Sequence, residues 1–191
     1  PAAVVAGNVE TSQCIVDGLL AATNRLAAGP GTMNNFTFGD DTYQYYETIC
    51  SGAGAGPGFD GADAVQTHMT NSRLTDPEVL EWRYPVLLES FSIRKGSGGQ
   101  GKYHGGNGVV RRIRFLAPMK AALLANRHRT QPFGINGGED GASGAAWVER
   151  MDGGIEKLGP TAEVSMGKDD VFVILTPGGG GYGSPESGSG N

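Results

Sequence analysis

The chain has little of what would mark it as a membrane, zinc-binding or disulfide-stapled protein. No apolar run approaches the roughly 20 residues that a membrane-spanning helix needs. Only two of the 191 residues are cysteine, and they form no C-x-x-C pair. No H-E-x-x-H or G-x-S-x-G motif occurs, so zinc-site and serine-hydrolase interpretations have no support. We therefore expect a soluble, cytoplasmic protein with two buried free thiols.

Charge is also scarce and unevenly placed. Charged residues make up 18% of the chain, below the usual share of about 25%. Residues 90–138 hold nine Lys or Arg and no Asp or Glu, although the whole chain has a net charge of −5. This segregation fits either an anion site facing a substrate or acidic partner, or the solvated faces of successive strands. The negative net charge of the whole chain argues against nucleic acid as a partner.

Glycine is what the chain has in excess, with 33 residues against a usual share of about 7%. The glycines follow no three-residue repeat and come with only ten prolines, which excludes collagen. They gather in residues 52–61, 96–108, 134–144 and 178–183. Ordering the run GGGGYG costs conformational entropy, so it either lets another backbone or a ligand approach closely or is a flexible terminus.

Hydrophobic spacing in the first 85 residues predicts an α+β part. Ile15, Val16, Leu19 and Leu20 recur at helical spacing after an N-cap at Thr11 or Ser12, and Gly29-Pro30-Gly31 ends that helix. Residues 32–38 and 43–50 are typical of a β-hairpin. A second, short helix starts at Asp76-Pro77 and runs to about Trp82.

Short alternating runs dominate after residue 85. We expect strands there at residues 86–94, 108–116, 120–126, 145–150, 155–158, 161–165 and 171–175. The fold class is therefore α+β and mostly β, with a β-sandwich or barrel-like half joined by glycine-rich loops. We divide the chain into an α+β part (1–85), a β-rich part (86–183) and a flexible polar tail (184–191).

The densest group of polar side chains lies in HMTNSRLTDPE, residues 68–78. In an extended segment Asn71 and Arg73 share one face, where they suit a carboxylate or amide, and His68 points to the other. Our candidate catalytic residues are His68, Asn71 and Arg73, supported by Asp76. For Asp76 helix capping is a sufficient alternative role, and a lone histidine is more often structural.

Residues 96–102, GSGGQGK, come close to a phosphate-binding P-loop. Tyr103 follows the lysine where Ser or Thr would hold magnesium, and glycines prevent a good helix after it. We interpret the segment as a strand connection whose amides cradle an anion. The short basic cluster Arg127-His128-Arg129 either binds an anion or lies on a plain loop. The candidate substrate-binding residues are Gly98, Gly99, Lys102, Arg127 and Arg129, and no metal ligand is assigned.

Seven strings spread over nearly the whole chain carry a resemblance to a known family. They lie at residues 7–13, 31–39, 45–81, 83–86, 94–115, 132–141 and 176–183. Together they resemble the hydantoinase B and 5-oxoprolinase proteins, which include the matching subunit of acetone and acetophenone carboxylases.

This resemblance implies the C-terminal part of a larger ATP-dependent amidohydrolase. Such an enzyme opens a cyclic amide, 5-oxoproline or a hydantoin, after phosphoryl activation by a hydantoinase A-type subunit or domain. That partner binds ATP and magnesium, and any divalent metal belongs to the upstream half of the same protein. The fragment alone is expected to be inactive. Two other functions stay open: a non-catalytic assembly module, or part of an ATP-dependent ketone carboxylase subunit.

Overall fold

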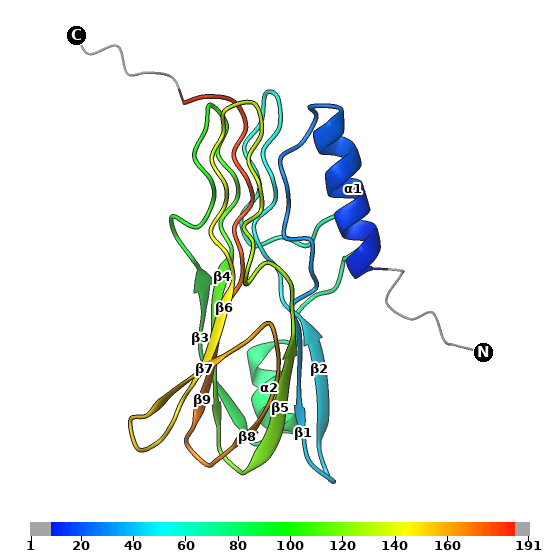
Figure 1. Ribbon diagram of the computed structural model, residues 1–191. Helices are drawn as coiled ribbons and strands as arrows, with labels where there is room; N and C mark the ends of the chain where they lie inside the picture. Colours follow the sequence, from blue (N-terminus) through cyan, green and yellow to red (C-terminus); the bar gives the residue numbers. More distant parts are fainter. Residues whose placement is uncertain (1–8, 186–191) are drawn as a thin grey trace.

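The computed structural model describes residues 9–185. Figure 1 shows two β-sheets at one end and a bundle of extended, glycine-rich segments at the other, with helix α1 (Glu10–Ala22) beside the bundle. The predicted flexible tail lies outside the described residues from residue 186 on. No helix among residues 9–185 is long and apolar enough to span a membrane.

Both sheets are antiparallel, and of the two predicted architectures, sandwich or barrel-like, they form the β-sandwich. The first has the strand order β2-β1-β5-β8, and its strands are β1 (Asn35–Gly39), β2 (Gln44–Thr48), β5 (Met119–Leu124) and β8 (Thr161–Met166). The second has the order β3-β4-β9-β6-β7, and its strands are β3 (Val86–Ile93), β4 (Val109–Phe115), β6 (Ala145–Glu149), β7 (Ile155–Leu158) and β9 (Val171–Leu175). Helix α2 (Pro77–Arg83) precedes β3.

The predicted β-hairpin forms, and it pairs with strands from the other part of the chain. Strand β1 lies antiparallel to β5, with Phe38 opposite Ala121. The first sheet therefore contains segments from both sides of residue 85.

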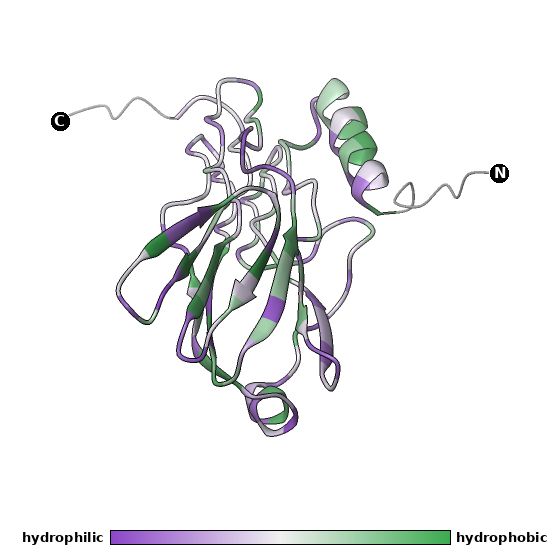
Figure 2. Ribbon diagram, turned by 60° about the horizontal axis from the view of Figure 1, so that its bottom comes forward, coloured by the Kyte–Doolittle hydropathy of each residue, from purple (hydrophilic) through white to green (hydrophobic). Residues whose placement is uncertain are grey.

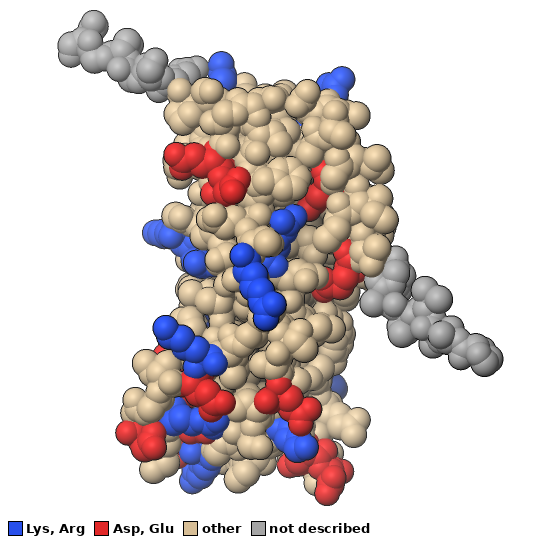
Figure 3. Space-filling view, in the orientation of Figure 1, with Lys and Arg blue, Asp and Glu red and all other residues tan. Residues whose placement is uncertain are grey.

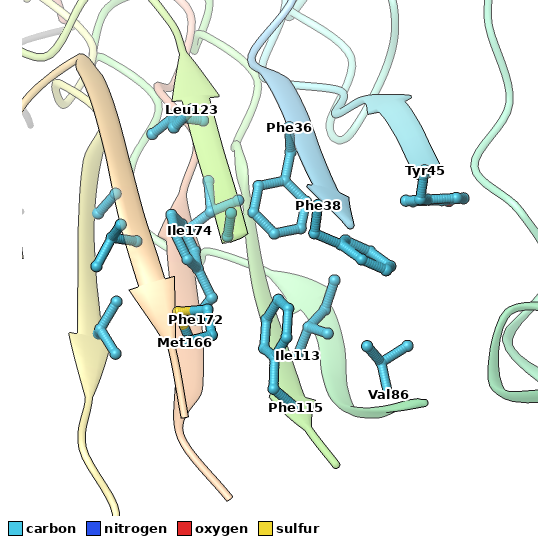
Figure 4. Packing of buried hydrophobic residues seen from close by; sticks show 14 of the residues in the cluster. Phe36, Phe38, Tyr45, Val86, Ile113, Phe115, Leu123, Met166, Phe172 and Ile174 are labelled. Carbon is cyan, nitrogen blue, oxygen red and sulfur yellow. The ribbon is translucent and has the colours of Figure 1, made fainter. Parts of the chain in front are cut away.

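Aromatic side chains fill the space between the sheets (Figure 4). The rings of Phe36 and Phe172 lie 4.8 Å apart, and Phe38 meets Phe115 edge-on at 5.4 Å. All four side chains are at most 3% exposed. Strands β1, β4 and β6 supply the core by alternation, because every second residue of a strand points inward.

One charged side chain occupies an inward position of β4. Arg111 lies between Val109 and Ile113 in the alternation and forms a two-pronged ion pair with Glu47 of β2, at 2.6 and 2.8 Å. The two side chains are only 1% and 3% exposed. Tyr45 donates a hydrogen bond to the same carboxylate at 2.8 Å, and its own burial together with the charge of Glu47 raises the pKa of Tyr45 to about 12. Arg111, Glu47 and Tyr45 thus form a buried polar cluster whose members bond to one another inside the apolar core.

Three further bases of residues 90–138 lie on strands and meet acids of nearby strands, namely Arg112, Arg114 and Lys120. Arg112 forms ion pairs with Glu149 at 2.7 Å and Glu89 at 3.1 Å, and Arg114 also pairs with Glu89. Figure 3 shows basic and acidic side chains side by side over the sheets, whereas the visible face of the glycine-rich end is mostly uncharged. For these strand bases the segregation in sequence therefore becomes pairing in space, which favours the strand-face interpretation for this part of the segment.

These ion pairs predict a specific acid sensitivity. The hydrogen bonds from Arg112 lower the pKa of Glu149 to about 2, below the value of about 4.3 expected in the unfolded chain. The ionised form therefore stabilises the fold above about pH 4.5, and this contribution is lost as the pH falls toward 2. We expect Glu149→Gln to flatten the loss of stability between these values, measured by urea unfolding at a series of pH values. Glu163→Gln, at an exposed ion pair, is the control, and an unchanged acid slope in Glu149→Gln would contradict the assignment.

Residues 177–183 run through the middle of the glycine-rich end. The amides of Gly178, Gly179 and Gly180 donate in turn to Ala142, Gly106 and Ala28, and Gly181 returns to Glu139 of the first segment. The hydrogen-bond partner segment thus recurs every third residue. Three residues per turn is the period of a polyproline II helix, which has no internal hydrogen bonds. Its backbone groups are instead satisfied by the surrounding segments.

Glycine is required in this bundle because backbones touch. A Cβ atom on Gly179 would lie 1.8 Å from the carbonyl oxygen of Ala53, and one on Gly178 would lie 1.9 Å from that of Ser97. Gly178 to Gly181 are all buried. Of the two interpretations of GGGGYG, close approach of another backbone is therefore what the structure shows.

Helix α1 faces the bundle with its polar side, contrary to the expectation from hydrophobic spacing. Gln13 and Asp17 are 0% and 1% exposed, whereas Ile15 and Leu19 are 56% and 63% exposed. The helix begins at Glu10 with Val9 as its N-cap, so the predicted N-cap at Thr11 or Ser12 is wrong. The polar side of α1 points inward because the surface below the helix presents backbone amides and threonine hydroxyls, which need polar partners.

Candidate functional site

A histidine and a buried carboxylate meet between α1 and the segment that follows the glycine loop. His68 Nε2 lies 2.9 Å from Asp17 Oδ1. The Asp17 side chain is 1% exposed and the His68 side chain 13% exposed. With the proton on Nε2, the ring donates to the carboxylate and leaves Nδ1 as its basic nitrogen. This is the geometry by which a carboxylate orients a general base.

Polar contacts from α1 hold both partners in place. Gln13, one turn before Asp17, donates to Thr70 and accepts from Thr67 at 3.0 Å, so the residues on either side of His68 are tied to the helix. The Gly29 amide donates to Asp17 Oδ1 at 3.2 Å. Asp17 Oδ2 is buried and accepts no hydrogen bond from the described residues.

The backbone at His68 is held in an unusual conformation. Its φ is +51°, in the left-handed region that non-glycine residues seldom adopt and that often occurs at functional sites. The turn lets the ring reach Asp17 across 51 positions of sequence. An extended backbone at this point would direct the ring elsewhere.

Asn71 and Arg73 lie apart from the dyad and share a cavity. The cavity has a volume of about 360 Å³, and its walls include Cys50 and Phe91 as well as the two predicted residues. His68 is not among its lining residues. The predicted division, with Asn71 and Arg73 together and His68 on another side, matches this placement. Their roles in substrate binding stay predictions.

Cys50 forms part of the wall of this cavity. Burial raises the pKa of its thiol, which favours the protonated and less reactive form. Both cysteines are free, but Cys14 is exposed, so the expectation of two buried thiols is wrong for Cys14.

Asp76 caps helix α2. Its carboxylate accepts a hydrogen bond from the Glu78 amide at 3.0 Å, and Pro77 occupies the first helical position. This contact explains the residue by local structure. A supporting role in catalysis stays a prediction.

The predicted anion-binding loop uses its amides within the chain. The Gly98 amide donates to Asn107 Oδ1 at 3.2 Å, and the Gly99 amide donates to the Gly179 carbonyl at 2.9 Å. The Lys102 amide likewise donates to Gly183. A phosphate or substrate would have to displace these bonds, and the loop does not offer the open row of amides that a nucleotide phosphate needs.

Arg127 and Arg129 lie at different places on the surface. Arg127 donates to the Gln131 carbonyl at 3.1 Å, and its guanidinium lies 5.9 Å from the Phe133 ring. Arg129 lines an open groove of about 720 Å³ with Trp147. The structure does not bring these arginines to the Asn71 and Arg73 cavity, whose lining includes neither. Within residues 9–185 no group of three or more His, Cys, Asp and Glu side chains is arranged to hold a metal ion.

Asp17 is the member of the dyad that sequence reasoning missed. It lies in a helix where the spacing of the apolar residues alone predicts the wrong buried side. The available signal was the pair Gln13 and Asp17, four residues apart and therefore on one helix face. Without the backbone surface opposite, that pair could not be distinguished from a solvated face.

Comparison with known proteins shows what the chain is similar to. The sequence model of the family described as Hydantoinase B/oxoprolinase matches residues 1–185. A 5-oxoprolinase of Dictyostelium discoideum is 48% identical over 185 residues, which cover 97% of this chain and 15% of that protein. The chain therefore spans about 15% of the length of this curated relative.

Two solved structures share the fold. An ATP-dependent caprolactamase from Pseudomonas jessenii superposes with a TM-score of 0.76 and 25% identity, covering 87% of this chain and 32% of its own. A nucleotide-free acetone carboxylase gives a TM-score of 0.67 at 20% identity, covering 88% of this chain and 28% of its own. The second likeness is one of fold alone.

Proposed function

Because the chain belongs to the hydantoinase B/oxoprolinase family, we propose that it supplies a general acid–base dyad, His68 and Asp17, to an ATP-dependent amidohydrolase. The substrate class is a cyclic amide, 5-oxoproline or a hydantoin. The observation that carries the proposal is the 2.9 Å contact between His68 Nε2 and a carboxylate that is 1% exposed. The relatives named as 5-oxoprolinase and caprolactamase support the same reaction class.

The proposed chemistry uses the free nitrogen of the histidine. Nδ1 of His68 takes a proton from the water that attacks the amide carbon, while Asp17 holds the ring orientation and stabilises the imidazolium. A carbon–oxygen bond forms to the water oxygen and the ring carbon–nitrogen bond breaks, which leaves an acyl phosphate on the opened chain. The proton then passes from Nδ1 to the departing ring nitrogen, which restores the dyad. A second water molecule then hydrolyses this acyl phosphate, so the activating phosphoryl group leaves as inorganic phosphate.

Asn71 and Arg73 are the proposed orienting pair. An arginine and an amide lining one cavity of about 360 Å³ suit a carboxylate or amide group. Because His68 does not line this cavity, the pair holds a group of the substrate other than the amide under attack. Activation by ATP and magnesium belongs to a hydantoinase A-type domain or subunit in this proposal, since the amides of residues 98 and 99 are already bonded within the chain. The remainder of the longer protein completes the site.

The proposal predicts distinct kinetic effects in the full-length enzyme. His68→Ala and Asp17→Asn should each lower kcat about 10²-fold or more, the scale of a lost general base. Arg73→Ala should mainly raise KM, because it removes a binding contact. Steady-state assays of ring opening with 5-oxoproline and a hydantoin as substrates measure both.

His104→Ala is the matched control, since it removes another histidine of this chain, whose backbone lies in the glycine bundle. It should retain near-normal turnover. Near-normal turnover of His68→Ala would refute the catalytic role, and so would an equal loss in His104→Ala.

A further inference from the structure

The outward face of α1 has the composition of a buried surface. Ile15, Gly18, Leu19 and Ala22 are all exposed, and they follow the spacing i, i+3, i+4, i+7, which places them in one stripe along the helix. Ile15 and Leu19 are 56% and 63% exposed. In Figure 2, green marks hydrophobic residues on this helix, which stands at the edge of the molecule.

The charged residues of α1 all point the other way. Glu10 accepts hydrogen bonds from the Met33 amide at 2.9 Å and from the Asn126 side chain at 2.6 Å. Asp17 is buried against His68. A helix with one side in water normally shows the opposite pattern, with charges outward and the apolar stripe inward. The polar side of α1 therefore faces this chain, and the apolar stripe is left without a cover among the described residues.

Gly18 points to the same conclusion by an independent route. It lies in the middle of the helix, where glycine is less favourable than alanine. Among residues 9–185, a Cβ atom built on it would meet nothing within 4 Å, so no contact of that part of the chain requires glycine there. In the glycine bundle, by contrast, glycine marks places where another backbone touches, as at Gly179. Glycine between Ile15 and Leu19 gives a second element room for close approach.

We propose that this stripe of α1, residues 15, 18, 19 and 22, is the docking surface for an apolar helix from another part of the same long polypeptide, which crosses α1 at Gly18. Most of a 5-oxoprolinase-type protein lies outside this chain, because 97% of the chain aligns to only 15% of the Dictyostelium discoideum relative. The stripe is uncharged, so its partner is apolar rather than acidic or basic. Docking there also braces the side of α1 opposite Asp17. The proposal does not depend on the catalytic role of the dyad.

Photo-crosslinking in the full-length protein tests the occupant. Photoreactive benzoylphenylalanine replaces Leu19 in one variant and Met151 in the control, since Met151 is an apolar residue that is 75% exposed in the turn between β6 and β7. The position 19 probe should cross-link within one polypeptide to a peptide outside these 191 residues. Cross-links between two copies would overturn the proposal in favour of self-association, and cross-links confined to these 191 residues, or none, would overturn docking.

Hydrogen exchange provides a second readout that does not require a cross-link. Leu19→Asp in the full-length protein should speed deuterium exchange of the α1 amides about 10-fold or more, because a carboxylate in an apolar interface displaces the partner. Met151→Asp should leave these amides unchanged. An unchanged exchange rate of the α1 amides in a folded Leu19→Asp variant would overturn the proposal.

Discussion

Gly179→Ala is expected to prevent folding of the glycine-rich end. The added methyl group would lie 1.8 Å from the Ala53 carbonyl oxygen and 2.7 Å from the Gly54 amide nitrogen. Both contacts are to backbone, so no side-chain rotation relieves them. Moving the segment would also break the bond from Gly179 to Gly106 and the one it receives from Gly99. We expect a loss of about 5 kcal/mol or more, the tail of point-mutation effects, seen as loss of soluble protein and of the thermal transition.

Gly159→Ala is the control for this substitution. A Cβ atom there would meet its nearest neighbour, the Thr161 carbonyl oxygen, at 3.8 Å, which is ordinary contact. Its stability should change by no more than about 0.5 kcal/mol. A Gly179→Ala protein with a normal thermal midpoint would show that the bundle is not close-packed at its centre.

Glu47→Gln is expected to have the second large effect on stability. The substitution leaves the Arg111 guanidinium charged and 1% exposed, without its carboxylate. Breaking a buried pair in this way costs about 3–5 kcal/mol. Denaturant unfolding should show the loss, and a double variant with Glu47→Leu and Arg111→Met should recover most of it, because no charge is then left buried.

The matched control is Glu163→Gln, which breaks the pair with Lys120 where the side chains are 67% and 75% exposed. Its effect should stay within about 0.5 kcal/mol. Equal losses in Glu163→Gln and Glu47→Gln would contradict the burial argument, as would a double variant less stable than Glu47→Gln alone.

Local signals sufficed for the strands and the second helix. Strands β7 (Ile155–Leu158) and β9 (Val171–Leu175) begin and end where the sequence predicts, because turn residues bound each alternating run. Asp76-Pro77 likewise starts α2, since a cap and a first-turn proline act within a few residues. Such features need no knowledge of the rest of the fold.

The bundle and α1 depended on contacts that no local pattern encodes. Gly178 to Gly181 are required because an added Cβ atom on each would overlap a neighbouring backbone. The neighbouring segments come from distant parts of the sequence, so no three-residue pattern of residue types records this packing. Helix α1 turned its polar side inward because that side meets backbone and hydroxyl groups. The apolar spacing of Ile15 and Leu19 is a true helical signal whose partner lies elsewhere.

The sequence predicted only part of the candidate site, because part of it depends on contacts between distant residues. His68, Asn71 and Arg73 were identified from polar density in one segment, which is a local property. Asp17 joins His68 across 51 positions, and only the positive φ at His68 turns the ring toward it. That backbone turn is not visible in the residue types.

The most direct test of the proposed function is the ratio of ring-opened product to ADP formed by the full-length His68→Ala protein with 5-oxoproline. If the dyad acts in ring opening while activation occurs elsewhere in the protein, ATP consumption continues and the product per ADP falls about 10²-fold. An unchanged ratio, with product formed at the normal rate, would contradict the assignment of His68 and Asp17 as the acid–base dyad.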